Sequence, residues 1–135
     1  MQAEFKNQSG DIYLIVTYDK ENKWLYNRWF GFVTDEEIKK AADNFFQNQE
    51  KGLIKQILND NTEQTGPWEK ANDWLEQIWM PRAAKAGLEQ FAHVIAPGIY
   101  SALSAQDMHR RTGPFFQMKI FGDIDKAQAW LKSFQ

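Results

Sequence analysis

Hydrophobic residues recur along the chain with two different periods, which separate expected strands from expected helices. Near the end of the chain, Phe116, Met118 and Ile120 alternate with polar residues until Gly122 and Asp123 interrupt the run. The apolar residues then continue at helical spacing as Ala127, Trp130, Leu131 and Phe134. Alternation over a few residues is typical of a strand, and a repeat near 3.6 is typical of an amphipathic helix. The closing segment therefore predicts a strand, a turn and a helix.

Two apolar runs near the start, residues 12–18 and 24–33, predict strands joined by the polar loop 19–23. A loop this short favours an antiparallel hairpin. Residues 1–11 are interpreted as a polar N-terminal lead, so the domain is expected to span residues 12–135. After the hairpin, Thr34 and Glu37 have the spacing of a capping box, and the apolar stripe behind them predicts a first helix that ends by Gly52.

The middle of the chain predicts two further strands and two further helices. A short strand is expected over residues 54–58, followed by a polar turn at 59–62 and a helix from Pro67 to Gly87 that Pro81 interrupts. Residues 91–96 predict the fourth strand. The third helix, residues 99–111, is expected to turn Ile99, Ala102, Leu103 and Met108 inward.

The order of elements is β-β-α-β-α-β-α-β-α, which indicates a single α/β domain. Successive β-α-β units favour a mostly parallel five-stranded sheet with an antiparallel first strand. The strand at 91–96 is apolar on both faces, as a central strand would be, whereas Gln117 and Lys119 give the last strand the pattern of an edge. We expect one face of the sheet to be thinly covered by helices.

Composition narrows the classes of function. The formal charge is −2, from 16 basic and 18 acidic residues that are mixed along the chain, which argues against a nucleic-acid groove. Cysteine is absent and only two histidines are present, so neither disulfides nor a metal site nor any other cofactor is expected. No apolar stretch is long enough for a membrane span, and the N-terminus lacks the pattern of a secretory signal. A cytoplasmic protein is expected.

The chain resembles the SpoIIAA-like group of STAS domains, which are relatives of bacterial anti-sigma factor antagonists and, more distantly, of CRAL-TRIO lipid-transfer domains. The resemblance rests on residues 121–131, with the letters FGDIDKAQAWL, and on Ala86 and Gly87 leading into residues 92–96. It implies a STAS-like fold in a bacterial protein that works by protein interaction, including dimer formation. In that group a serine in an Asp-Ser-Ser-Gly type motif, after the third strand, is phosphorylated.

The corresponding segment here, residues 59–68, contains no serine, and Thr65 is the nearest hydroxyl. An N-cap for the following helix is the favoured interpretation of Thr65, and a phosphoacceptor is the alternative. Asp60, Asn61 and Thr62 follow the end of the expected third strand, where open α/β sheets bind ligands. Turn formation explains the same residues equally well, so a switch or ligand loop at this place stays one of two interpretations.

Other side chains have both a structural and a functional interpretation. Trp24, Tyr26, Phe30 and Phe32 share one face of the second expected strand with Arg28; they form core if a helix covers that face, which is the commoner case, and an interaction surface if none does. His93 is expected to be a hydrogen-bonded core residue rather than a catalytic base.

Arg110 and Arg111 end the third expected helix. The helix dipole accounts for their charge there, and an anionic partner is the alternative.

The leading functional hypothesis is a non-enzymatic STAS-like module that docks to a protein partner or to itself. The alternative is a carrier or sensor of a small apolar or lipid ligand, which the surplus of aromatic residues suggests. An enzyme is the third choice, because no nucleophile, base and oxyanion donors can be assembled from the spacing.

Overall fold

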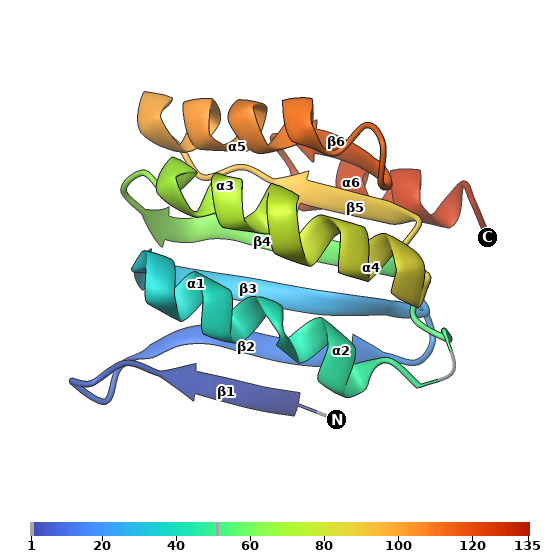
Figure 1. The fold of residues 1–135 in the computed structure, drawn as a ribbon, viewed down its shortest axis with the longest axis horizontal. Coiled ribbons are helices and arrows are strands. Elements are labelled where there is room, and N and C mark those ends of the chain that lie inside the picture. The colour runs from blue at the N-terminus through green and yellow to red at the C-terminus, as the bar shows by residue number, and fades with distance from the viewer. Residues whose placement is uncertain (1, 51) are drawn as a thin grey trace.

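A computed structural model describes residues 2–50 and 52–135 of the chain. Its strands form one sheet in the order β1-β2-β3-β4-β5-β6 (Figure 1). The strands are β1 (Gln2–Lys6), β2 (Ile12–Asp19), β3 (Trp24–Phe32), β4 (Gln56–Thr65), β5 (Gln90–Val94) and β6 (Gln117–Phe121). β1, β2 and β3 pair antiparallel, and β3 to β6 pair parallel. The α/β class, the hairpin and the mostly parallel sheet are therefore confirmed.

The expected count of five strands is one too few, because the polar N-terminal lead contains β1. In β1 the exposed Gln2, Glu4 and Lys6 alternate with the half-buried Ala3 and Phe5. The strand pairs with β2, and the ring of Phe5 packs edge-on against a ring in that strand at 6.1 Å. Only one side of an edge strand is paired and only one face of β1 is covered, so two apolar residues suffice to hold it.

The helical segments interrupt the strands at the expected places but are more broken than the pattern predicts. They are α1 (Asp35–Ala42), α2 (Asn44–Asn48), η1 (Glu69–Ala71), α3 (Asn72–Trp74), η2 (Leu75–Trp79), α4 (Met80–Ala86), α5 (Ile99–Arg111) and α6 (Ile124–Lys132). The first expected helix ends at Ala42 and is followed by α2.

The expected capping box at the start of α1 is confirmed. The Thr34 amide donates to the Glu37 carboxylate at 3.0 Å, and the Glu37 amide donates to the Thr34 hydroxyl at 3.2 Å. The expected interruption at Pro81 takes the form of η2, a π-helical turn that immediately precedes α4. Proline has no backbone donor, so a wider turn before it avoids an unmade hydrogen bond.

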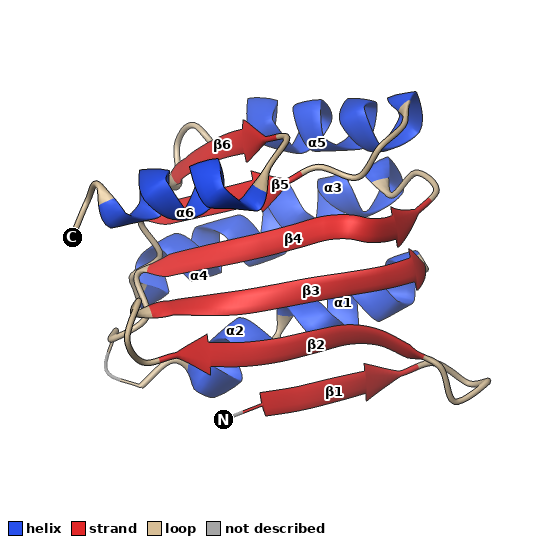
Figure 2. Ribbon diagram, turned by 180° about the vertical axis from the view of Figure 1, so that it is seen from behind, coloured by secondary structure: helices blue, strands red, loops and turns tan. Residues whose placement is uncertain are grey.

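The helices cover the two faces of the sheet unequally. Figure 1 shows α1 to α5 in front of the sheet, and Figure 2, from behind, shows α6 alone, with β1, β2 and most of β3 bare. The core is accordingly divided into a large cluster under α1 to α5 and a small one under α6. The small cluster consists of Trp24, Leu58, Ala92, Val94, Ala127 and Leu131. The expected thin cover of one face is confirmed; we call this face the open face.

The two strands next to the C-terminal edge also match their patterns. Every residue of β5 is buried, and β6 is the edge strand. Among the described residues, no helix has both the length and the apolar character needed to cross a bilayer.

Candidate functional site

The polar segment that was expected to be a loop is the second half of β4. Asp60, Asn61 and Thr62 continue the strand, which ends at Thr65. β4 lies between β3 and β5, so its polar residues find partners across the sheet: Asn27 is paired with Asn59, and Arg28 with Asp60. The ladder then shifts register between Arg28 and Phe30, so that β4 holds one extra residue, as in a bulge. The expected loop conformation is wrong, because sheet pairing overrides the turn preference of Asn and Asp. A switch or ligand role for Asp60, Asn61 and Thr62 stays a prediction.

Thr65 is not the N-cap that the sequence favours. The residue that precedes η1 is Trp68, and no side chain caps that helix. Thr65 is an exposed strand residue. Its phosphorylation stays a prediction. Asp60 acts locally instead, since its Oδ1 accepts from the Thr62 amide at 3.0 Å and from the Thr62 hydroxyl at 2.7 Å.

The side chains of β4 that face α1 to α5 form a chain of neutral amides. Trp29 Nε1 donates to Asn59 Oδ1 at 2.8 Å, and Asn59 Nδ2 donates to Asn61 Oδ1 at 2.7 Å. Asn61 Nδ2 in turn donates to Gln64 Oε1. Asn59, Asn61 and Gln64 are all buried. Hydrogen bonds between these amides offset the cost of removing them from water.

His93 of β5 joins this amide chain as a neutral group. Its Nδ1 lies 3.1 Å from Asn59 Nδ2, and only 1% of its surface is exposed. Burial lowers the pKa of His93 to about 4, although the charge of Asp60 opposes the shift. At neutral pH the ring carries no charge, and Nδ1 accepts a hydrogen bond from Asn59 Nδ2. The rings of Trp68 and Phe91 pack beside it at 5.6 and 6.4 Å. The expectation of a hydrogen-bonded core histidine is confirmed.

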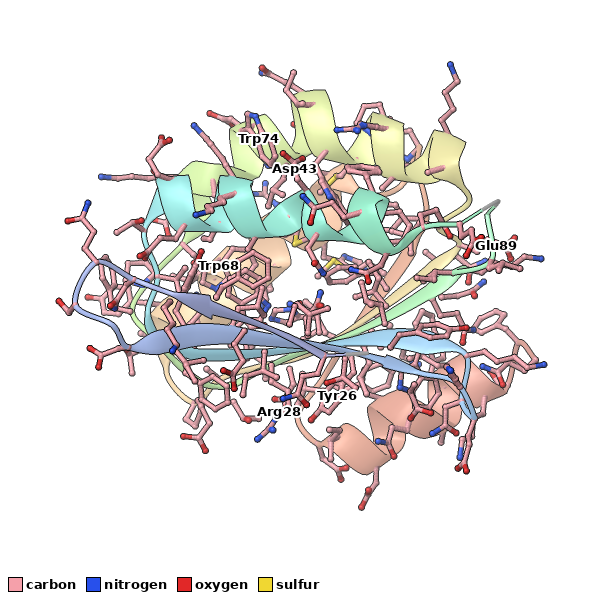
Figure 3. All side chains as sticks on the ribbon, turned by 90° about the horizontal axis from the view of Figure 1, so that it is seen from below. Tyr26, Arg28, Asp43, Trp68, Trp74 and Glu89 are labelled. Carbon is pink, nitrogen blue, oxygen red and sulfur yellow. The ribbon has the colours of Figure 1, made fainter. Side chains whose placement is uncertain are left out.

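A cavity of about 70 Å³ lies between this polar chain and the helices. Its apolar walls include Ile38 and Ala41 of α1, Phe45 of α2 and Leu75 of η2. The amides of Asn27, Asn44, Asn59, Asn61 and Gln64 supply its polar part. Within residues 2–50 and 52–135, no charged side chain lines the cavity. Trp68, which also lines it, lies between the sheet and the helical layer in Figure 3.

Two polar atoms at this cavity lack a hydrogen-bond partner among the described residues: Asn27 Oδ1 and Asn44 Nδ2. Asn44 is 5% exposed and begins α2 directly behind α1. No local pattern in the sequence marks Asn27, Asn44, Asn59 or Gln64 as site residues. Residues 59–65 form an unbroken polar run, which is the composition of a turn.

The open face carries part of the aromatic set that was expected to be core or an interaction surface. Trp24 is 1% exposed beneath α6, so it belongs to the core and the interaction-surface interpretation is wrong for this residue. Tyr26 and Phe30 are half-buried, and Arg28 is exposed, with its guanidinium 5.3 Å from the Phe30 ring centre. Figure 3 shows Tyr26 and Arg28 on the side of the sheet opposite to Trp68.

Tyr26 and Asp60 interact on this face. The Tyr26 hydroxyl donates to Asp60 Oδ2 at 3.2 Å. Burial, followed by the neighbouring charge of Asp60, raises the pKa of Tyr26 to about 12. The phenol therefore stays protonated and serves as a donor. Asp60 thus has a structural partner on each side, Thr62 along the strand and Tyr26 across it.

The two arginines at the end of α5 lie far from that surface, on the helical layer, and they are engaged within the chain. Arg111 forms ion pairs with Asp73 at 2.6 Å, Glu76 at 3.1 Å and Asp107 at 3.1 Å. Arg110 pairs with Asp107 as well. Arg111 ties α5 to the α3 and η2 segment, so the structure does not bring these arginines together with Arg28.

α5 shows an inverted distribution of polar and apolar residues. It buries Ser101 and Ser104, whereas Ile99, Tyr100 and Leu103 are 69%, 66% and 54% exposed. The expectation that Ile99 and Leu103 face inward is wrong, although Met108 is buried as expected.

The serines of α5 face inward because of the segment that packs against this helix. Ser104 Oγ accepts from the Trp68 amide at 3.1 Å and lies 3.0 Å from Glu69 Oε2, so it serves the uncapped start of η1. We call Ile99, Tyr100 and Leu103 the α5 outer patch.

A groove of about 420 Å³ lies beyond the carboxyl ends of β3 and β4. Residues 32–36 and 67–70 line it. This is the place where open α/β sheets commonly bind ligands. Its rim is acidic, with Asp35, Glu36 and Glu69, and only Lys70 is basic. An anion is therefore disfavoured there.

Comparison with known proteins identifies the fold. No protein-family model matches the chain, and no curated protein matches it significantly. Among solved structures, the chain is similar to an uncharacterised DUF3478-family protein with a SpoIIAA-like fold from Shewanella loihica PV-4. The TM-score is 0.56 at 18% sequence identity, and the match covers 87% of this chain and 91% of the other. The protein thus has a SpoIIAA-like fold.

Proposed function

We propose that this protein is a non-enzymatic, cytoplasmic SpoIIAA-like module that binds a protein partner through the α5 outer patch. The observation that carries the proposal is the exposure of Ile99, Tyr100 and Leu103, each more than half exposed within the first turns of one helix. Exposed apolar residues are normally scattered singly, whereas a contiguous group of them marks an interaction site. The partner is a second protein or another copy of this chain.

The contrast with α6 supports the assignment of α5 as the docking element. α6 buries Ala127 and Leu131 against the sheet in the ordinary way, and Asp123 caps its start by accepting from the amides of Asp125 and Lys126. A helix that buries serines and exposes isoleucine and leucine is stabilised less by its own packing. Covering the patch would remove this apolar surface from water, which favours association by roughly 25 cal/mol per Å² before the costs of binding.

The interior of the protein supports binding rather than catalysis. His93 is enclosed by Asn59, Trp68 and Phe91, and it is neutral at physiological pH. A general base must reach the proton that it abstracts. His93 instead has a structural partner on Nδ1.

Site-specific cross-linking tests the proposal directly, because the natural chain has no cysteine. A Leu103→Cys variant with a photoactivatable cross-linker on its thiol should form an adduct, of twice the chain mass for self-association or of another mass with a partner in a cell lysate. Ala129→Cys on the exposed side of α6 is the matched control. The proposal fails if the Leu103→Cys protein gives no adduct beyond the control and sediments as a monomer at high concentration.

The open face offers a second docking surface, supported by the exposed Arg28 beside the half-buried Tyr26 and Phe30. Arginine and tyrosine are common at the energetic centres of interfaces. An Arg28→Glu variant separates the two surfaces. Loss of the Leu103→Cys adduct in this variant would show that the partner reaches the open face, and an unchanged adduct would restrict it to α5.

A further inference from the structure

The cavity between the helices and strands β3 and β4 has a composition that ordinary core packing does not require. Its walls are apolar and its polar part is made of amides, without a charged side chain among the described residues. Most of the amides satisfy one another through the chain from Asn59 to Gln64. Asn27 Oδ1 and Asn44 Nδ2 are left over, one an acceptor and the other a donor. A buried polar group without a partner costs roughly 1–3 kcal/mol, so a protein seldom keeps two at one cavity.

The chemistry of the two leftover atoms defines what would complete them. Asn27 Oδ1 needs a donor and Asn44 Nδ2 needs an acceptor. One group that both donates and accepts, such as a hydroxyl or a primary amide, matches the pair. An ionised group does not match, because the surroundings supply no opposite charge and burying an unpaired ion is costly. His93, the nearest titratable member of the amide chain, is itself neutral.

We propose that this cavity is a binding site for a small uncharged molecule that carries a hydroxyl or carboxamide group on a short apolar chain. The polar group bridges Asn27 and Asn44, and the apolar chain lies against Ile38, Ala41 and Phe45. The site lies between the sheet and the helical layer, and none of the α5 outer patch lines it, so the proposal does not depend on the proposed docking function. Water alone would satisfy the two amides but would leave the apolar walls without a matching partner.

The volume sets the size of the ligand. A cavity of about 70 Å³ is about half the volume of one that takes up benzene, and it is too small for a lipid chain. Propionamide and 1-propanol are suitable probes, and propionate is the matched anionic control because it has nearly the same shape as propionamide.

Nuclear magnetic resonance titration of the full chain tests the proposal. Propionamide should shift the side-chain amide signals of Asn27 and Asn44 in a saturable way, and propionate should bind at least tenfold more weakly. Ala41→Leu, which fills the cavity from its wall, should abolish the shifts. Asn44→Leu, which removes the unpaired donor, should weaken propionamide at least tenfold. Asp60→Asn on the open face is the control and should leave the affinity unchanged.

Ile38→Val keeps the experiment decisive if the two cavity variants fail to fold. It removes one methylene from the cavity wall, so it should improve the binding of butyramide relative to propionamide. Equal affinity for propionamide and propionate would overturn the proposal. Shifts that survive Ala41→Leu, or the absence of any saturable shift with either neutral probe, would overturn it as well.

Discussion

The two faces of β4 place closely related side chains in opposite environments. Asn59 faces the helices, where it is buried and bonded to other amides, and Asp60 next to it faces the open side, where it accepts from a tyrosine and a threonine. The two residues differ by one terminal group, an amide against a carboxylate. Neutral groups occupy the covered face and ionisable groups the face that solvent reaches, because burial penalises charge far more than it penalises a bonded amide.

The same division separates His93 from Tyr26. His93 lies on the covered face and its pKa is lowered to about 4, whereas Tyr26 lies on the open face and its pKa is raised to about 12. Burial is the main cause of both shifts, and in both cases it favours the uncharged form. The covered face is therefore a neutral environment, and the open face keeps Asp60 and Arg28 where solvent reaches them.

Placing a charge on the covered face of β4 should have the largest effect on the free energy of unfolding. Asn59→Asp places a carboxylate within the amide chain, where Asn61 Oδ1 and His93 Nδ1 lose their donor. The carboxylate would keep the hydrogen bond from Trp29 Nε1 but would have no opposite charge beside it. An uncompensated buried charge costs about 3–5 kcal/mol, and we expect Asn59→Asp to lower the free energy of unfolding by about that amount at pH 7. Urea denaturation followed by circular dichroism measures the change.

The opposite exchange on the neighbouring residue is the control. Asp60→Asn keeps one oxygen, which can still accept from the Thr62 amide and hydroxyl, and it gives up the oxygen that accepts from Tyr26. The loss of one partly exposed hydrogen bond should lower the free energy of unfolding by only about 1 kcal/mol. Comparable losses in the two variants would show that the faces of β4 do not differ in the way described.

Acidification should have the next largest effect, because protonation of His93 places a charge on the covered face and lowers the free energy of unfolding. The folded pKa of His93, about 4, lies below the ordinary value of 6.5, so between these values the unfolded chain binds a proton that the folded chain does not. The contribution of neutral His93 to the free energy of unfolding is fully present above pH 6.5. It is lost as the pH falls towards 4, by about 3 kcal/mol in all. Unfolding in urea at pH 7, 6 and 5 measures this slope.

His93→Gln supplies the comparison for the pH experiment, because glutamine can still accept from Asn59 and does not titrate. The variant should lose most of the slope between pH 6.5 and 4. An unchanged slope would show that other groups cause the pH dependence of stability and that protonation of His93 does not contribute to it.

The sequence predicts correctly those elements whose signals lie in neighbouring residues. The hairpin, the capping box of Thr34 and Glu37, and the closing strand and helix depend on neighbouring residues, and the structure confirms them. The strand β1 was missed because its apolar residues are only Ala3 and Phe5, and a pairing partner supplies the rest of its stability.

The candidate site could not be predicted from the sequence, for a different reason. Residues 59–65 have the composition of a turn, and they form a strand because β3 pairs with this segment as far as Thr65, while β5 pairs with Asn59 and Asp60. Asn44 and Asn27 meet at the cavity from elements separated along the chain, which no local pattern reveals. The inverted pattern of α5 is similar, since Ser104 faces inward and accepts from the amide of Trp68 in another segment.

The smallest expected effect concerns the bond between the two groups on the open face. Tyr26→Phe removes the hydroxyl that donates to Asp60 Oδ2 while it keeps the ring against the small core cluster. We expect a loss of about 1 kcal/mol, which is modest because Asp60 keeps its bonds to Thr62 and access to water. Denaturation of the variant at pH 7 measures the loss.

An absorbance titration gives the same bond an independent readout. The raised pKa of Tyr26 means that its stabilising effect is fully present below pH 10 and is lost as the pH rises towards 12. Two tyrosines of the natural protein should ionise late, Tyr26 and also Tyr13, because burial raises the pKa of both. Asp60→Asn should lower the pKa of Tyr26, because the charge of Asp60 is the second cause of its shift. Tyr26→Phe identifies which late ionisation belongs to Tyr26. If that ionisation persists unchanged in Asp60→Asn, burial alone accounts for it, and the open face differs from the covered face in its access to solvent but not in its charge.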